Sequence, residues 1–125
     1  MLDKILFAAA TFMAAHNLDT PEVAFTDDVR ILPPGAMGVT RCSLKDDVVN
    51  CGVFIHTCYE HPKVTYKQLK TIVLHELAHY VDVMSDKDPD GHRGQWVHIM
   101  KAWGQKPVAL VKWDKLPESC RRAEQ

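Results

Sequence analysis

The sequence predicts a single α+β domain, with helices and a small antiparallel sheet built from separate stretches of the chain. The chain has 125 residues, which suits one domain with its own core. Apolar residues recur at helical spacing near the N-terminus and over 65–84, and two β-forming runs lie between these segments. We therefore expect one domain over 1–125, with a core at about 2–105 and a tail at 106–125.

Composition and charge narrow the classes of partner. Hydrophobic residues make up 46% of the chain and charged residues 25%, both ordinary for a soluble globular protein. The formal net charge is −1, whereas a surface built mainly to bind nucleic acid carries a clear basic excess. Lys63, Lys67 and Lys70 are more typical of a solvated helix face than of a binding patch. The composition thus argues against nucleic acid as the main partner.

The N-terminal segment, residues 2–17, is predicted to be a helix. Its apolar residues recur at helical spacing: Leu2, Ile5, Leu6, Ala9 and Met13. The run 5–15 after Lys4 also resembles the core of a signal peptide, but Asp3 weakens the positive flank of such a peptide. We expect a native helix of a cytoplasmic protein rather than a secretory leader. The run is too short to span a bilayer, so no membrane partner is expected.

Short strands are predicted to follow this helix. Residues 23–25 and 29–32 are strand candidates, and the turn at 33–35 separates them from the next pair. The segments 39–44 and 49–57 carry β-forming residues on either side of two aspartates, as a hairpin does.

A two-residue turn at 46–47 would fix the register of this hairpin. It pairs Lys45 with Val48 and Cys42 with Cys51. Alternation then gives the second strand two distinct faces, one with Cys51, Val53 and Ile55 and the other with Gly52, Phe54 and His56.

The four cysteines form no CxxC pair, which argues against a zinc ribbon or finger. Cys42 and Cys51 face each other in the predicted hairpin, so a disulfide is conceivable in an oxidising compartment. We expect half-buried thiols in a reducing cytosol instead. Cys120 carries no functional signal.

A strong amphipathic helix is predicted over 65–84, and a polar, turn-rich loop follows at 85–91. A further helix is expected from about Arg93 to Trp103, ended by Gly104. Its large side chains are expected to pack in the core: Trp96, Met100 and Trp103. Residues 108–113 are predicted to be a last strand or an extended tail.

The central helix contains the sequence His75-Glu76-Leu77-Ala78-His79. Because residues four apart lie on one helix face, both imidazoles can bind the same tetrahedral metal ion. Glu76 is rotated about a third of a turn away, where an acid–base group can act on a water at the metal. This arrangement is typical of zinc metalloproteases. It predicts hydrolysis of peptide bonds with Glu76 as general base and a metal-activated water as nucleophile.

A catalytic zinc usually has a third protein ligand. In metzincins it lies six residues past the second histidine, but Ser85 occupies that position here and excludes the family. We expect the third ligand to be His92, which follows the polar loop and opens the next helix. The remaining candidates are His98, Asp82, Asp86 and Glu118.

These motifs resemble the SprT-like (Spartan-type) zinc metalloproteases. The residues that carry the resemblance are His75 to Tyr80, His92-Arg93-Gly94-Gln95-Trp96, Met100 and Gly104. The resemblance covers roughly residues 2–105 and implies a zincin-like fold. It also implies one Zn²⁺ per chain, held by His75, His79 and His92, with Glu76 as the catalytic base.

The resemblance also bears on substrates and partners. In related zincins an edge strand pairs with the extended substrate, and Gly52 to His56 is the expected counterpart here. Spartan-type enzymes act on proteins crosslinked to DNA, using accessory elements that bind the DNA. The C-terminal zinc ribbon of many relatives is absent here, and Arg93 stands where the family has glycine. We therefore expect a protein or peptide substrate and do not carry the DNA association over.

Two other functions compete with this one. Peptide deformylases pair such a helix with an upstream cysteine ligand, for which Cys42 is the candidate, but Ala78 stands where they carry aspartate. The main alternative is a SprT-like zinc-binding module that binds or inhibits a protein partner with little or no catalysis. Glu76 argues against that module, because a purely structural zinc site needs no general base.

Overall fold

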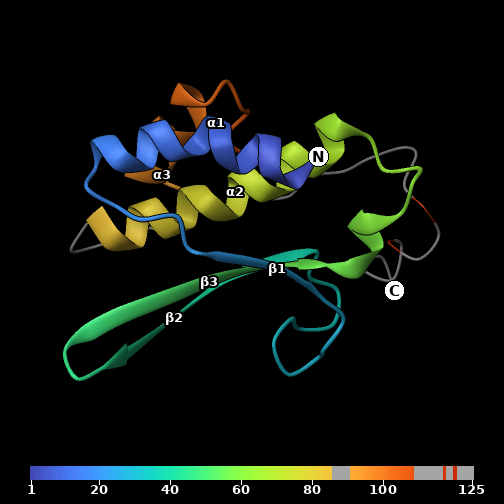
Figure 1. Ribbon diagram of the computed structural model, residues 1–125, viewed down its shortest axis with the longest axis horizontal. Helices are drawn as coiled ribbons and strands as arrows, with labels where there is room; N and C mark the ends of the chain where they lie inside the picture. The colour runs from blue at the N-terminus through green and yellow to red at the C-terminus, as the bar shows by residue number, and fades with distance from the viewer. Residues whose placement is uncertain (86–90, 109–116, 118–119, 121–125) are drawn as a thin grey trace.

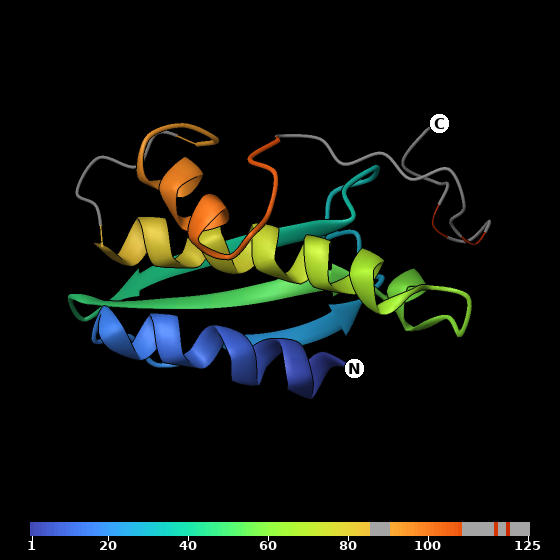
Figure 2. The ribbon, with the colours of Figure 1, turned by 90° about the horizontal axis from the view of Figure 1, so that it is seen from above.

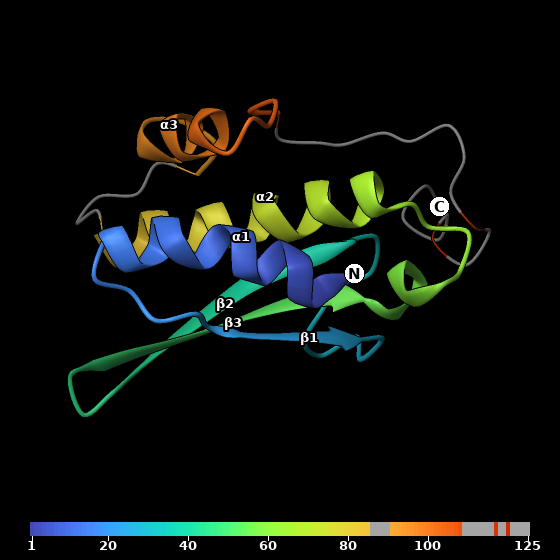
Figure 3. The ribbon, with the colours of Figure 1, turned by 45° about the horizontal axis from the view of Figure 1, so that its top comes forward.

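The computed structural model describes residues 1–85, 91–108, 117 and 120. These residues form an α+β domain in which two helices lie side by side over one face of a sheet (Figures 1 and 2). A third helix packs against the second (Figure 3). The elements are, in chain order, α1 (Leu2–Ala15), β1 (Glu22–Thr26), β2 (Gly38–Lys45), β3 (Val48–His56), the 3₁₀ turn η1 (Thr57–Glu60), α2 (Tyr66–Ser85) and α3 (Gln95–Ala102).

The predicted hairpin is confirmed in its register. Strands β2 and β3 are antiparallel, and they pair Lys45 with Val48 and Cys42 with Cys51. The turn residues Asp46 and Asp47 have φ of 51° and 63°. Positive φ at both central residues is the conformation that matches the twist of a two-residue hairpin.

The sheet differs from the expected antiparallel one because β1 pairs with β3 in parallel. Among the described residues the strand order is β1-β3-β2, so β3 is the central strand. The prediction that Gly52 to His56 form an edge strand is therefore wrong. The local sequence pattern identifies individual strands. It does not show that β1, which comes earlier in the chain, pairs with β3 on the side opposite β2.

The strand expected at 29–32 is also wrong, since these residues form a turn. The backbone carbonyl of Asp28 accepts hydrogen bonds from the amides of Ile31 and Leu32, at 3.0 and 2.9 Å. The Asp28 carboxylate accepts a further one from the amide of Arg30 at 2.9 Å. An aspartate that binds its own following backbone favours a turn over an extended chain.

The main core lies between the sheet and the two helices that cover it. Val53 and Ile55 alternate along β3 and are both fully buried, as the predicted face of this strand requires. The helices contribute apolar side chains at helical spacing, among them Ile5, Ala9 and Met13 from α1 and Val73, Leu77 and Val81 from α2.

Helix α2 begins at a reciprocal cap. The Thr65 hydroxyl accepts a hydrogen bond from the amide of Gln68 at 3.1 Å, and the Gln68 side chain accepts one from the amide of Thr65 at 2.9 Å. This capping box satisfies two amides that the first turn leaves without helical partners. It fixes the start of the helix that carries His75, Glu76 and His79.

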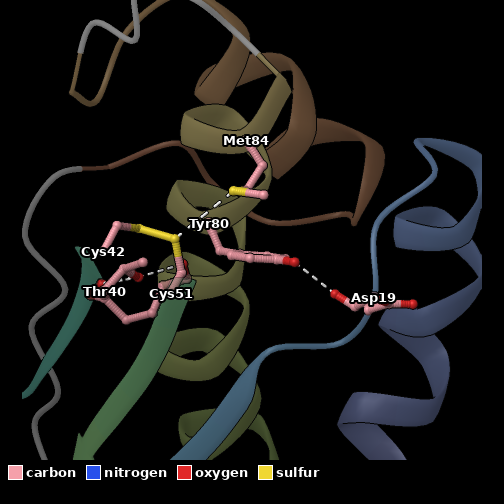
Figure 4. Close-up of a disulfide and its surroundings, with 7 residues drawn as sticks. Asp19, Thr40, Cys42, Cys51, Tyr80 and Met84 are labelled. Atoms are coloured by element: carbon pink, nitrogen blue, oxygen red, sulfur yellow. Dashed lines mark hydrogen bonds between the residues drawn. A yellow bond between two sulfur atoms is a disulfide. The ribbon is translucent and has the colours of Figure 1, made fainter. Parts of the chain in front are cut away.

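All four cysteines form disulfides, so the expectation of free thiols is wrong. Cys42 pairs with Cys51 directly across the hairpin, beside α2 (Figure 4). Cys58 of η1 pairs with Cys120, 62 residues later in the chain. The sequence places the first pair face to face, but nothing local connects Cys58 with Cys120.

Part of the C-terminal segment lies outside the described residues. The strand or tail expected at 108–113 falls mostly there, as do the ligand candidates Asp86 and Glu118. Within the described part of the chain, none of the helices combines the length and apolar character needed to cross a membrane.

Candidate metal centre

Three histidines from two parts of the chain come together beside α2. His75 and His79 lie one helical turn apart, and His92 comes from the segment just before α3. One nitrogen of each ring lies within 4.8 Å of the others, and the Nε2 atoms of His75 and His92 are 3.3 Å apart. The three histidines are therefore close enough to bind one metal ion.

The spacing and chemistry of the donors fit zinc. Two ligands about 2.0–2.1 Å from a tetrahedral zinc lie about 3.4 Å apart, close to the separation of these two Nε2 atoms. Burial and then the neighbouring histidines lower the pKa of His75 to about 3, and burial with His92 lowers that of His79 to about 4. Both rings are consequently neutral near pH 7, with lone pairs available to a cation.

The cluster opens toward solvent on the side of His92. His75 is buried, His79 is intermediate and His92 is exposed. A site closed on one side by helix α2 and open on the other leaves access for a water or a substrate group, which a catalytic metal requires.

Two glycines shape the segment that brings His92 to α2. Gly91 and Gly94 have φ of 54° and 58°, in the left-handed region that side chains disfavour. A Cβ at either position would meet nothing within 4 Å, so the requirement is conformational rather than spatial. Helix α3 begins at Gln95, slightly later than the expected start at Arg93, because Gly94 still belongs to the turn.

Trp96 forms the inner wall of the site. It is fully buried, and its ring lies 5.0, 5.2 and 4.8 Å from those of His75, His79 and His92. Its Nε1 also donates a hydrogen bond to the His75 carbonyl at 3.3 Å. Core packing was expected for Trp96; the structure adds that this packing is against the three histidines. The four-residue spacing from His92 is the sequence signal for that contact.

Glu76 is the carboxylate beside the histidines. It is 7% exposed, and its Oε2 lies 3.9 Å from Nε2 of His75. Burial raises the pKa of Glu76 to about 7, while hydrogen bonds with Thr40 lower it in part. A carboxyl group with a pKa near neutrality can both accept and return a proton at the pH of most cells.

Strand β2 supplies two neighbours of Glu76 that the sequence did not indicate. The Thr40 hydroxyl lies 2.7 Å from the backbone carbonyl of Glu76 and 3.1 Å from its Oε1. A Cβ at Gly38 would lie 3.1 Å from Cγ of Glu76. Both residues precede Glu76 by more than thirty positions, so only the tertiary fold shows the contact.

The other ligand candidates in the described residues lie outside the cluster. His98 is exposed on α3, and Asp82 is buried further along α2. Cys42 is disulfide-bonded, so it cannot serve as the upstream thiolate ligand that a deformylase needs. The hydroxyl of Tyr59 donates a hydrogen bond to the sulfur of Met37. The hydroxyl of Tyr80 donates one to the backbone carbonyl of Asp19 (Figure 4).

Comparisons with protein-family models, with curated proteins and with solved structures give no match for this chain. The description of this chain therefore rests on its fold and its candidate site. Its described residues form an α+β domain with three histidines close enough to bind a metal ion, a buried carboxyl group beside them, and a strand, β2, in contact with that carboxyl group.

Proposed function

We propose that this chain is a zinc-dependent metallopeptidase with a zincin-like, SprT-like architecture. The observation that carries the proposal is the convergence of three histidine nitrogens next to a buried carboxyl oxygen, 3.9 Å from one of them. Imidazole donors also suit iron, copper and nickel. Zinc is favoured because the His-Glu-x-x-His spacing on one helix is the arrangement that zinc peptidases use.

His75, His79 and His92 would hold the ion, and His92 is exposed to solvent. Zinc in such a site polarises a carbonyl and lowers the pKa of a coordinated water to about 7. Glu76 accepts a proton from the attacking water as the water oxygen adds to the peptide carbonyl carbon. Glu76 then returns this proton to the nitrogen as the C–N bond breaks.

The strand that would bind the substrate is β2 rather than β3. β2 is at the edge of the sheet formed by the described strands, and it contacts Glu76 through Thr40. An extended peptide that adds to this edge by main-chain hydrogen bonds would pass beside the carboxyl group of Glu76. We therefore propose a protein or peptide substrate. The net charge of −1 gives no support for DNA as a partner.

The test compares the zinc-loaded wild type with Glu76→Gln on fluorescently labelled, unfolded casein. Glu60→Gln is the matched control, because Glu60 is an exposed glutamate outside the site. We expect Glu76→Gln to lower the cleavage rate by about 10²–10⁴-fold, the usual contribution of a general base. Zinc content should stay at that of the wild type.

Cleavage by Glu76→Gln at the wild-type rate would contradict the proposal. An inactive wild type that still binds zinc would favour the alternative, a zinc-binding module that acts by occupying a protein partner.

A further inference from the structure

Thr40 connects the edge strand to the reactive part of α2. Its hydroxyl oxygen lies 2.7 Å from the Glu76 carbonyl and 3.1 Å from Glu76 Oε1, although 36 residues separate the two positions. Figure 4 shows Thr40 on the hairpin, close to Cys42 and Cys51 and beside α2. A hydroxyl has one proton and two lone pairs, so it donates to one of these oxygens at a time.

The two oxygens of the Glu76 carboxyl group have different neighbours. Oε1 is in contact with Thr40, and Oε2 lies 3.9 Å from Nε2 of His75. When the hydroxyl donates to Oε1, rotation of the carboxyl group is restricted and the other oxygen stays turned toward the histidines. When it donates to the backbone carbonyl instead, it ties α2 to the strand and stays in contact with Oε1.

Gly38 limits the other side of the same carboxyl group. A Cβ there would lie 3.1 Å from Glu76 Cγ and 3.4 Å from its Oε2. The first distance is tighter than an ordinary van der Waals contact, so a side chain at this position would push Glu76 away. Gly38 and Thr40 face α2 from alternate positions of β2, and together they confine Glu76.

The strand that carries these residues is fixed independently of α2. Gly38 pairs with Ile55 and Thr40 with Val53, both fully buried residues of the central strand. Two residues beyond Thr40, the Cys42–Cys51 disulfide joins the same two strands. A partner whose own position is set by the sheet can hold a carboxyl group in one orientation at little entropic cost.

We propose that Thr40 is a positioning residue, which holds Glu76 with Oε2 directed at the metal site. This inference rests on the proposed function for its catalytic meaning, but not for its geometry. Removing the hydroxyl should leave the metal bound and the substrate edge intact. It should let the carboxyl group turn away from the atoms on which it acts.

The experiment uses the zinc-loaded chain with Thr40→Val, which keeps the shape of the side chain and removes the hydroxyl, and Thr40→Ser, which keeps the hydroxyl. Thr11→Val is the matched control, since Thr11 is an exposed hydroxyl residue of α1, away from the site and from the proposed substrate-binding strand. Binding of acetohydroxamate is measured by calorimetry, because a hydroxamate ligates the metal and hydrogen-bonds to a carboxylate beside it. The loss of acetohydroxamate affinity in Glu76→Gln measures how much the Glu76 carboxylate contributes to binding. The values of kcat and KM on casein are measured in parallel.

For Thr40→Val we expect acetohydroxamate affinity and kcat each to fall about tenfold, the effect of one hydrogen bond to a charged group. KM and zinc content should stay within twofold of the wild type. Thr40→Ser should recover most of both losses.

Thr40→Val with wild-type affinity for acetohydroxamate would overturn the inference. So would equal losses in Thr40→Ser and Thr40→Val, which would assign a packing role to Thr40. Equal affinity of wild type and Glu76→Gln would also overturn it, because Glu76 would then not face the metal. If the wild type cleaves no casein while the hydroxamate series behaves as expected, the proposed function fails and the positioning role stands.

Discussion

His75, His79 and Glu76 are ionisable side chains that one short stretch of helix buries together. Burial is the largest cause of all three pKa shifts, and it favours the neutral form of each side chain. The histidines therefore become better metal ligands, while the carboxyl group becomes able to exchange a proton near neutral pH. The same environment thus prepares two chemically different roles.

These shifts make the stability of the metal-free chain depend on pH. Between pH 4.5 and 6.5, the unfolded chain binds protons on His75 and His79 that the folded chain does not. Each histidine therefore lowers stability as the pH falls through this range. Glu76 has the opposite sign, because its raised pKa means that the folded chain binds the extra proton. Glu76→Gln should consequently steepen the loss of stability on acidification.

The measurement is urea unfolding of the metal-free wild type, Glu76→Gln and Glu60→Gln at several pH values between 4.5 and 6.5. The Glu60→Gln control should follow the wild type, since this exposed residue lies outside the cluster. A Glu76→Gln curve parallel to the wild type would show that Glu76 does not carry the raised pKa.

At the scale of secondary-structure elements, the packing of α3 on α2 sets the shape of the metal site. Trp96 from α3 contacts all three histidine rings and donates a hydrogen bond to the backbone of His75. The neighbours of metal ligands orient those ligands, and their loss typically costs about 10–100-fold in metal affinity.

We expect Trp96→Phe to weaken zinc binding by about tenfold, at the lower end of that range. An aromatic ring remains at this position, but the hydrogen bond to the His75 carbonyl is lost. Trp103→Phe is the control, since Trp103 packs against Phe12 instead of the histidines. Competition with a chromophoric zinc chelator measures both affinities. Equal weakening by the two substitutions would mean that general loss of packing, rather than the contact with His75, is responsible.

The elements that the sequence predicts well are those with a local cause. The apolar stripe of α2 and the two-aspartate turn each act over a few residues. The parallel pairing of β1 with β3 depends on a crossover between distant segments, so no local pattern indicates it. For the same reason, local pattern does not show that Gly52 to His56 lie in the central strand of the described sheet.

The residues of the candidate site also fall into those that local sequence indicates and those that only the tertiary fold brings together. His75, Glu76 and His79 follow from spacing on one helix, and His92 from the need for a third ligand. Thr40 and Gly38 reach Glu76 only through the tertiary fold, from a strand that precedes it by more than thirty residues. A hydroxyl residue in a strand has no sequence feature that distinguishes a positioning role from an ordinary one.

Across the whole molecule, the two disulfides tie different parts of the chain together. Cys42–Cys51 closes a short hairpin, whereas Cys58–Cys120 spans 62 residues and connects the C-terminal region to η1. Disulfides persist in oxidising compartments and are rare in the cytosol. The pairing of all four cysteines is the observation that weighs against the expected cytoplasmic location, which stays a prediction.

The two disulfides should contribute unequally to stability. In the chain-entropy model, the Cys42–Cys51 disulfide, with a separation of 9 residues, stabilises the fold by about 3 kcal/mol. The Cys58–Cys120 disulfide, with a separation of 62 residues, stabilises it by about 4 kcal/mol. The double substitution Cys58→Ser with Cys120→Ser should therefore lower the free energy of unfolding more than Cys42→Ser with Cys51→Ser. Guanidinium unfolding of both variants measures the difference. A larger loss from the hairpin pair would contradict this account.

The central claim is that His75, His79 and His92 hold one metal ion, and metal content tests it most directly. Elemental analysis is carried out on the wild type, His92→Ala and His98→Ala, purified identically without added metal. His98 is the matched control, an exposed histidine outside the cluster. We predict one zinc per chain in the wild type and in His98→Ala, and a sharply reduced zinc content in His92→Ala. Undiminished zinc in His92→Ala, or no metal in the wild type, would contradict the three-histidine site.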